Sequence, residues 1–478
     1  MSKAIRILFL FLFVFAAESL CAQSLSSIIK KAPNQEAFWS VTVRDENGGI
    51  LESYHPKKAI IPASNQKLVT SAALLDYFGS DFKFVTNIYG DGSQQGATWM
   101  GDLIIKGSGD PSISGDLYDG DRYHVFEVFL EQLQDQGIER VEGDLLADVS
   151  LFDTQYYPKG WDWYDMSFYY GVQVSPLSFN NNAVDLDVYA EGNIGDTPRI
   201  SWFPENTDYV TFVNEQVITH PATEYDEYYR REMGGNTIVL GSTLPQGYHE
   251  EEALSVNNPA LFFLDSFKKY LLRNGISVTG DIEILPAEAS YDTSMVLAQH
   301  HSKPLGKLIE WLNKESDNFY TEMLVKKLSA QSGTQPGTFE DGIKLVRVFL
   351  DGLGIDTTYV QMNDGSGMAA GNFNQTSILS GLLQNMQDHP EFDSYFSSMS
   401  IAGIDGTLAH RMKGTPLYQN FRGKSGFVTG VRTLSGYMEA KSGKKLIVSL
   451  ATNSFISEKV RPIDAVHEEI LMYLYEKY

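Results

Sequence analysis

The chain has 478 residues, a formal net charge of −24 and an ordinary globular composition, with 43% hydrophobic and 21% charged residues. This length is enough for two or three domains, and the composition excludes a largely disordered chain. The strong negative charge argues against partners such as nucleic acid or an anionic lipid surface, because both carry charge of the same sign.

Residues 1–22 are typical of a secretory signal peptide. Lys3 and Arg6 precede an apolar run over 7–17, and small residues follow near Ala22. The run is shorter than the roughly 20 residues that a membrane-spanning helix needs. We therefore expect cleavage after Ala22, export to the periplasm or cell envelope, and a mature chain without a cysteine or a transmembrane segment. An uncleaved anchor and lipidation of Cys21 are the alternatives.

The segment 23–85 begins with strand and helix patterns. Alternating residues over 38–44 and 50–54 flank a glycine-containing turn, which predicts a β-hairpin. Helical spacing then extends over 65–78 and ends at Gly79.

The region 86–285 has a different sequence pattern, with short strand-like runs between Gly, Asp and Asn turns and many aromatic residues. This pattern predicts a β-rich insertion, interpreted as two nested modules. The clearest strand patterns cover 102–106, 143–148, 183–189 and 237–240. A helical pattern appears at 261–273.

The remaining residues return to longer elements. Helical spacing covers 305–328 and 462–475, and strand patterns cover 426–440 and 446–453. We expect 23–85 and 286–478 to form one split domain. An insertion of this size is tolerated where its two ends lie close together at the surface.

Three short motifs occur in a fixed order along the split domain. They are S-x-x-K at Ser64–Lys67, S-D-N at Ser316–Asn318 and K-S-G at Lys424–Gly426. Each is weak alone, since S-x-x-K also begins at Ser27, Ser266 and Ser442. The functional copy of each motif therefore has to be identified from its position relative to the predicted helices and strands.

Ser64 precedes the predicted helix directly, where unpaired backbone N–H groups can stabilise an oxyanion. Lys67 lies one turn later on the same face, so its amine can approach the Ser64 hydroxyl. It can accept a proton if burial lowers its pKa. The alternative is a helix-capping serine beside a surface lysine.

Ser316 and Asn318 lie in a polar break within the helical pattern. A serine there can relay a proton, and an amide can hold a substrate carbonyl. The alternative is again a helix cap, and Asp317 is given no catalytic role.

Lys424, Ser425 and Gly426 open an apolar strand pattern. Lys424 and Ser425 are candidates for binding a substrate carboxylate, and Gly426 for letting the substrate backbone come close. The backbone N–H of Phe427 is the candidate second oxyanion donor beside that of Ser64.

With these motifs the chain resembles the D-alanyl-D-alanine carboxypeptidases/endopeptidases of peptidase family S13, the class C low-molecular-mass penicillin-binding proteins. The resemblance includes the segments 107–111, 175–182, 363–367 and 402–408, and the long separation of Lys67 from Ser316. It implies an α/β (α+β) fold, with a β-lactamase/transpeptidase-like domain whose antiparallel sheet lies between helices, interrupted by a β-rich insertion. Ser425 in place of the commoner threonine and the bulky Phe427 are its departures.

The implied function is a serine DD-peptidase, a carboxypeptidase and/or endopeptidase, that cleaves D-Ala-D-Ala-type bonds of peptidoglycan through a Ser64 acyl-enzyme. Its implied partners are stem peptides, cross-links and β-lactam inhibitors. The alternatives are a serine β-lactamase or esterase on the same scaffold, and a non-catalytic wall-binding protein. No cofactor or metal is expected, since no histidine has the spacing of a zinc hydrolase, and His300-His301 is interpreted as a polar loop.

Overall fold

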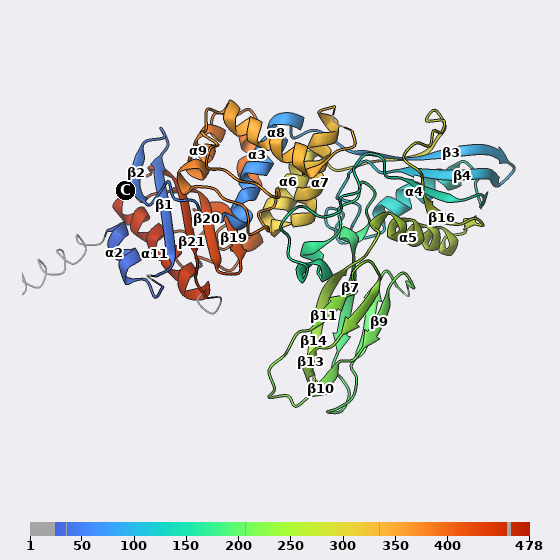
Figure 1. The fold of residues 1–478 in the computed structure, drawn as a ribbon, viewed down its shortest axis with the longest axis horizontal. Coiled ribbons are helices and arrows are strands. Elements are labelled where there is room, and N and C mark those ends of the chain that lie inside the picture. The colour runs from blue at the N-terminus through green and yellow to red at the C-terminus, as the bar shows by residue number, and fades with distance from the viewer. Residues whose placement is uncertain (1–23, 35, 206, 334, 457–459) are drawn as a thin grey trace, which may run out of the picture.

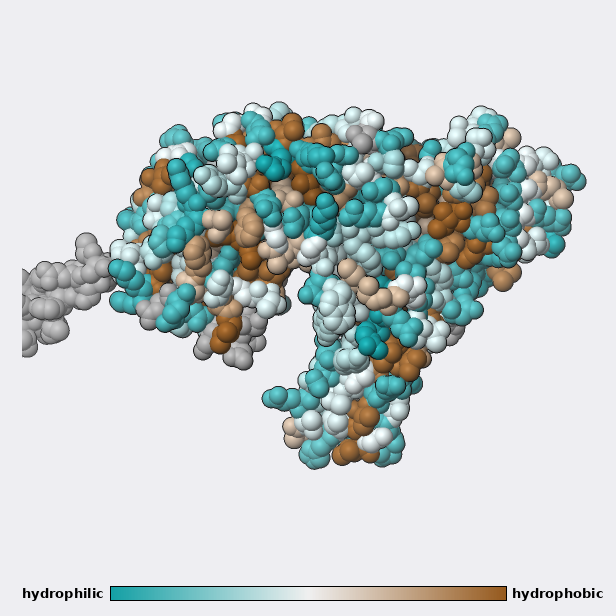
Figure 2. Space-filling model, in the orientation of Figure 1, coloured by the Kyte–Doolittle hydropathy of each residue, from teal (hydrophilic) through white to brown (hydrophobic). Residues whose placement is uncertain are grey.

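The computed structural model describes residues 24–478 apart from 35, 206, 334 and 457–459. The expected signal peptide, its cleavage site and Cys21 therefore lie outside the described residues. The chain forms a helix-and-sheet core and an inserted region, part of which projects as a separate lobe (Figure 1). The surface is hollowed between the core and this lobe (Figure 2).

The first and last parts of the chain share one six-stranded antiparallel sheet with the order β18-β19-β20-β21-β1-β2. The strands are β1 (Phe38–Asp45), β2 (Ile50–Tyr54), β18 (Ser400–Ile401), β19 (Arg422–Val428), β20 (Val431–Glu439) and β21 (Lys445–Asn453). β1 pairs along its whole length with β21, which joins residues 400 positions apart in the chain. One sheet therefore contains strands from both ends of the chain, while the domain bounds 23–85 and 286–478 stay a prediction.

Both faces of this sheet are covered by helices. β21 alternates between them, with Leu446 and Val448 packed toward α2 (Leu25–Lys31) and α11 (Val460–Lys477), and Ile447 packed toward the opposite layer. The helices of that layer are α3 (Gln66–Phe78), α6 (Leu305–Trp311), α7 (Asn318–Gln331), α8 (Phe339–Gly352), α9 (Thr376–Met386) and α10 (Phe392–Ser397). The expected antiparallel sheet between helices is confirmed.

The core contains one break that the polar residues at 316–318 predicted and one that the sequence analysis missed. The pattern over 305–328 is broken by a π-helical turn, Leu312–Ser316, after which Asp317 is extended and its carboxylate accepts from the backbone N–H of Tyr320. The pattern over 426–440 is also two elements, because Gly430 adopts a φ of +72° and turns the chain from β19 into β20.

The inserted region contains a seven-stranded sheet with α4 (His124–Asp135) and α5 (Pro259–Arg273). Its strands are β3 (Val85–Gln95), β4 (Thr98–Lys106), β5 (Arg140–Glu142), β6 (Leu145–Asp148), β15 (Ser277–Val278), β16 (Ile282–Ile284) and β17 (Val296–His301). β17 pairs antiparallel with β3, so this sheet extends past the expected boundary at 285. The backbone N–H of Ser302 donates to the carbonyl of Phe84 at 3.0 Å, so the insertion begins and ends at one place.

The projecting lobe consists of short strands in three small sheets, β14-β7-β8, β11-β12-β9 and β10-β13 (Figure 1). They are β7 (Ala183–Tyr189), β8 (Arg199–Phe203), β9 (Thr211–Asn214), β10 (Val217–Thr219), β11 (Tyr229–Arg231), β12 (Thr237–Leu240), β13 (Thr243–Pro245) and β14 (His249–Ser255). One hydrophobic cluster joins the lobe to the seven-stranded sheet, with Val184 and Ile238 from the lobe and Phe126 from α4. The division into two modules stays a prediction.

Three short 3-10 turns lie within the inserted region, η2 (Asp165–Ser167), η3 (Tyr169–Gly171) and η4 (Asn180–Asn182), and η3 contacts α7 of the core. Among the residues that the structure describes, no helix is both long enough and apolar enough to span a bilayer.

Candidate active site

Ser64 lies at the junction between the core sheet and its central helix. It belongs to the turn η1 (Ala63–Asn65), which leads directly into α3, and its side chain is half-buried. The carbonyl of Pro62 accepts from Thr433 Oγ1 of β20 at 2.8 Å, and the buried Asn65 amide contacts Ser435 of the same strand. These bonds fix the start of the helix against the sheet, as expected for a serine that has to present its hydroxyl in one direction.

Lys67 is fully buried and its ammonium group has three hydrogen-bond acceptors. Nζ lies 3.2 Å from Ser64 Oγ, 2.6 Å from Asn318 Oδ1 and 2.9 Å from the backbone carbonyl oxygen of Ser366. A lysine has three N–H donors, so this set uses all of them. Burial lowers the pKa of Lys67 to about 8, against the opposing effect of nearby carboxylates. The helical spacing predicted this serine–lysine contact correctly.

The loop Asp364–Gly367 supplies the third acceptor, and it lies within one of the segments that carry the family resemblance. Its backbone N–H groups at Gly365 and Ser366 donate to Glu322 Oε1 at 2.9 and 2.8 Å. Glu322 has no exposed surface, and burial raises the pKa of its carboxyl to about 8. Gly367 has a φ of +88°, and a Cβ there would overlap the Ala63 carbonyl beside Ser64.

The inserted region reaches this loop and the S-D-N motif. Trp161 Nε1 donates to Asp364 Oδ2 at 2.9 Å, and Asn318 Nδ2 donates to the Tyr170 carbonyl at 3.0 Å. Asn318 therefore bridges the lysine and the insertion. Sequence reasoning did not identify Trp161 or Tyr170.

Ser316 ends the π-helical turn with a φ of +63°, a backbone conformation uncommon for residues other than glycine. Within the described part of the chain, its hydroxyl has no protein hydrogen bond. The helix cap of α7 is Asp317, so the capping interpretation of Ser316 and Asn318 is wrong. Burial raises the pKa of Asp317 to about 6.

The strand β19 forms the opposite side of the site. Lys424 is fully buried, and its Nζ donates to the Ser425 carbonyl at 3.0 Å. Burial and the nearby positive charge of Lys67 lower the pKa of Lys424 well below its usual range. Ser425 Oγ donates to Thr407 Oγ1 at 2.7 Å.

Gly426 packs directly against the nucleophile turn. A Cβ on Gly426 would lie 2.9 Å from the backbone nitrogen of Ser64 and would overlap Thr433 Oγ1. Phe427 follows on the strand with half of its surface exposed, and the guanidinium of Arg432 lies 5.3 Å from its ring. A hydroxyl, a buried lysine with a lowered pKa and an adjacent strand backbone together suit acyl transfer.

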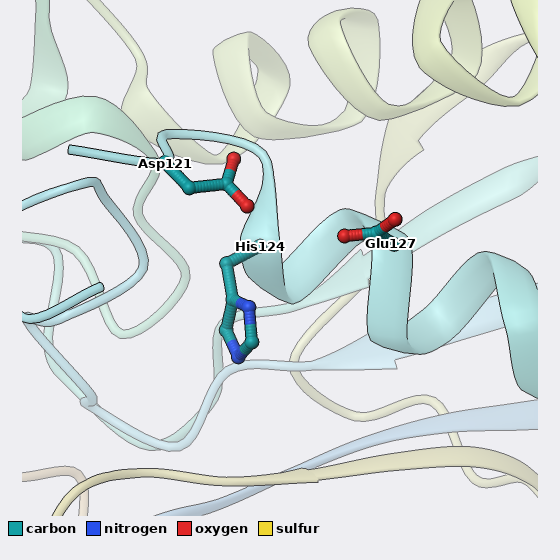
Figure 3. A group of neighbouring side chains, drawn as sticks. All are labelled: Asp121, His124 and Glu127. Carbon is teal, nitrogen blue, oxygen red and sulfur yellow. The ribbon is translucent and has the colours of Figure 1, made fainter. Parts of the chain in front are cut away.

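Candidate cation ligands lie elsewhere. Three His/Asp/Glu groups in the described residues bring their ligand atoms within 4.8 Å of one another, and none includes a residue of the three motifs. Figure 3 shows one of them, Asp121, His124 and Glu127, at the start of α4 in the inserted region, where both carboxylates are exposed.

His300 is not in a polar loop as expected. It is buried in β17 and hydrogen-bonded to the Tyr118 hydroxyl at 3.1 Å, and burial lowers its pKa to about 4.

The chain is similar to known peptidases in sequence. A family model described as the D-Ala-D-Ala carboxypeptidase 3 (S13) family matches residues 21–469. The chain is 29% identical over 450 residues to a D-alanyl-D-alanine carboxypeptidase of Actinomadura sp. (strain R39), covering 90% of this chain and 80% of the relative.

Solved structures show the same fold. The crystal structure of penicillin binding protein 4 (dacB) from Haemophilus influenzae superposes with a TM-score of 0.83 at 24% identity, over 95% of this chain and 100% of that one. The structure of the same protein complexed with a β-lactam has a TM-score of 0.76 at 23% identity, over 94% and 99%.

Proposed function

The chain belongs to the D-Ala-D-Ala carboxypeptidase (S13) family, and from this premise we propose that Ser64, Lys67 and Ser316 carry its reaction. The enzyme is a penicillin-binding serine DD-peptidase that cleaves D-Ala-D-Ala-type bonds of peptidoglycan. The observation that carries the assignment of residues is the 3.2 Å contact between Ser64 Oγ and the buried Lys67 amine, whose pKa is lowered to about 8.

Acylation begins with attack of Ser64 Oγ on the carbonyl carbon of the first D-Ala of the pair. The hydroxyl proton passes to the neutral Lys67 amine, and the carbonyl oxygen becomes an oxyanion. The backbone N–H groups of Ser64 and Phe427 are its donors, and the packing of Gly426 against the Ser64 nitrogen supports this pairing. Each such donor contributes a factor of about 10²–10³.

Collapse of the tetrahedral intermediate breaks the carbon–nitrogen bond. The leaving amine takes a proton from Lys67, relayed by the Ser316 hydroxyl, which has no competing hydrogen bond among the described residues. Water then attacks the Ser64 ester with Lys67 as base, which releases the peptide and restores the serine. A β-lactam acylates Ser64 in the same way.

Substrate binding is assigned to β19 and to the S-D-N motif. Lys424 and Ser425 bind the terminal carboxylate, and Gly426 allows the peptide backbone to lie along the strand. Asn318 holds a substrate amide while keeping Lys67 in place.

The substrate class also supports export. Peptidoglycan lies outside the cytoplasmic membrane, and residues 1–22 have the charge and length pattern of a signal peptide. We therefore place the enzyme in the periplasm or cell envelope, where stem peptides, cross-links and β-lactams are its partners.

The test is digestion of purified muropeptides followed by chromatography and mass spectrometry. The wild-type enzyme should release D-alanine from a pentapeptide muropeptide, and the Ser64→Ala variant should release none. Conversion of a cross-linked dimer to monomers would identify endopeptidase activity. A wild-type protein that is folded and leaves both substrates intact would refute the proposal.

A further inference from the structure

A second pocket lies in the inserted region, outside the serine site. It has a volume of about 350 Å³ and lies between the segment 157–167 and the turn that joins β11 to β12. Its lining combines aromatic and sulfur-containing side chains with amides, among them Trp163, Tyr164, Met233, Gln173 and Asn257. A pocket of this size with a few polar groups has the composition of a small-ligand site.

Large aromatic side chains at this pocket are exposed to solvent. Trp163 is 64% exposed and Tyr164 is 45% exposed, and their rings lie edge to face at 6.1 Å. Exposed aromatic residues that gather on one segment beside a pocket indicate a binding surface rather than an incompletely buried core.

The walls of the pocket are held by buried hydrogen bonds. Arg231 is buried and donates to the Tyr157 hydroxyl and to the Met166 carbonyl, both at 3.2 Å, and to Ser255 Oγ at 3.0 Å. Its remaining donors are bonded to backbone carbonyls of the β11–β12 turn. All N–H donors of the Arg231 side chain are therefore used within the protein, so Arg231 stabilises the pocket wall and has no donor left for an anionic ligand.

The pocket lining also contains Arg230 and Glu232, which are exposed and carry opposite charges, while its amides are suited to the neutral hydroxyls of a ligand. The Gln173 amide donates to Asn257 Oδ1 at 3.0 Å, while Asn257 Nδ2 has only a long contact of 3.4 Å to the Gly234 carbonyl. This amide can therefore turn to a ligand hydroxyl without breaking a strong bond.

The same segment leads directly to the serine site. Met166, in the pocket lining, is four residues from Tyr170, whose carbonyl accepts from Asn318. Four residues span at most about 14 Å. A stem peptide of a few residues covers a similar length, so one substrate molecule can occupy the cleft and the pocket together.

We propose that this pocket binds a sugar ring of the peptidoglycan glycan strand, so that the inserted region holds the polymer whose peptide Ser64 cleaves. A pyranose presents C–H bonds on its face, which pack on the Trp163 and Tyr164 rings, and hydroxyls at its edge, which bond to the amides of the pocket. This inference rests on the proposed function, since that substrate carries a glycan beside its peptide.

The binding test uses the Ser64→Ala protein with glycan strands from which an amidase has removed the peptides and whose freed lactyl carboxylates have been converted to amides, so that the probe is uncharged, and binding is measured by tryptophan fluorescence. Binding should weaken about tenfold in a Trp163→Ala derivative. Tyr359→Ala is the matched control, because Tyr359 is 62% exposed but lies on the core and not at this pocket, and it should bind normally.

The kinetic test uses Trp163→Ala with Ser64 intact. Its KM for polymeric peptidoglycan should rise about tenfold, while its hydrolysis of a glycan-free pentapeptide should stay at the wild-type rate. Equal loss on both substrates would overturn the proposal in favour of a peptide subsite. Unchanged glycan binding in the Trp163→Ala derivative would also overturn it. Glycan binding without any peptide hydrolysis by the wild type would instead refute the proposed function.

Discussion

The rate of Ser64 acylation should depend on pH through the protonation of Lys67. The lysine can accept the serine proton only as a neutral amine, and its pKa is lowered to about 8 by burial. The neutral fraction is then about 1% at pH 6, about 9% at pH 7 and about 91% at pH 9. The second-order rate constant should therefore rise about tenfold per unit below pH 8 and level off above it.

Stopped-flow mixing with a fluorescent penicillin between pH 6 and 9 measures this constant, with circular dichroism at each pH to show that the fold is retained. Asp317 and Glu322 face the lysine and titrate in the same range, with pKa values of about 6 and 8. Their ionisation raises the pKa of Lys67, so it broadens the rise without reversing it. A flat profile, or a rate that falls from pH 6 to 8, would refute Lys67 as the base.

Substitutions at three positions test the surroundings of the site. Gly426→Ala should slow penicillin acylation about 100-fold, because the added Cβ displaces the nucleophile turn and its N–H donor; a rate near wild type would contradict the close packing of β19. Glu322→Gln keeps an acceptor for the loop N–H groups, so this variant should still be acylated, with the midpoint of its pH profile moved downward. Glu322→Leu removes the acceptor and should abolish acylation. Equal pH profiles for Glu322→Gln and the wild type would exclude the electrostatic effect of Glu322 on Lys67. Trp161→Phe should lower the free energy of unfolding in urea by about 1.5–3 kcal/mol, since it removes one buried N–H donor from Asp364, and an unchanged midpoint would show that this bond is dispensable.

The serine and lysine could be predicted because their relation is local. Lys67 lies three positions after Ser64, so any helix that begins at Ser64 brings the two side chains together. Asn318 is different, because its contact with Lys67 joins residues 251 positions apart, and only the resemblance to a family brought the motifs into one site. The bounds of β7 and β12 also match the expected strands, since alternation and flanking turns are local signals.

Other parts of the site leave little trace in the sequence. The Ser366 carbonyl that receives the Lys67 ammonium is a backbone atom, which any residue would supply. Glu322 had a detectable signal, since it and Lys326 are charged residues four apart within an apolar helical pattern, and both are completely buried. A charged pair on the inward face of a helix indicates a buried polar network.

The missed boundaries also have physical causes. The polar residues predicted the break at Ser316, but not its positive φ, because that backbone conformation depends on tertiary packing. β17 was missed because His300 and His301 end its apolar run, although the His300 ring packs against Tyr118 and Phe129 of the inserted region. The turn at Gly430 was visible as Thr-Gly between two apolar runs, and the wrong prediction there came from giving the apolar runs more weight than the glycine.

The most direct test of the catalytic assignment is to locate the acyl group after exposure to benzylpenicillin. Intact-mass spectrometry should show one penicilloyl group on the wild-type protein, and fragmentation should place it on Ser64. The Ser64→Ala variant should remain unmodified, and Lys67→Ala should be modified far more slowly. An adduct on any other residue, or a folded wild-type protein that gains no mass, would contradict Ser64 as the nucleophile.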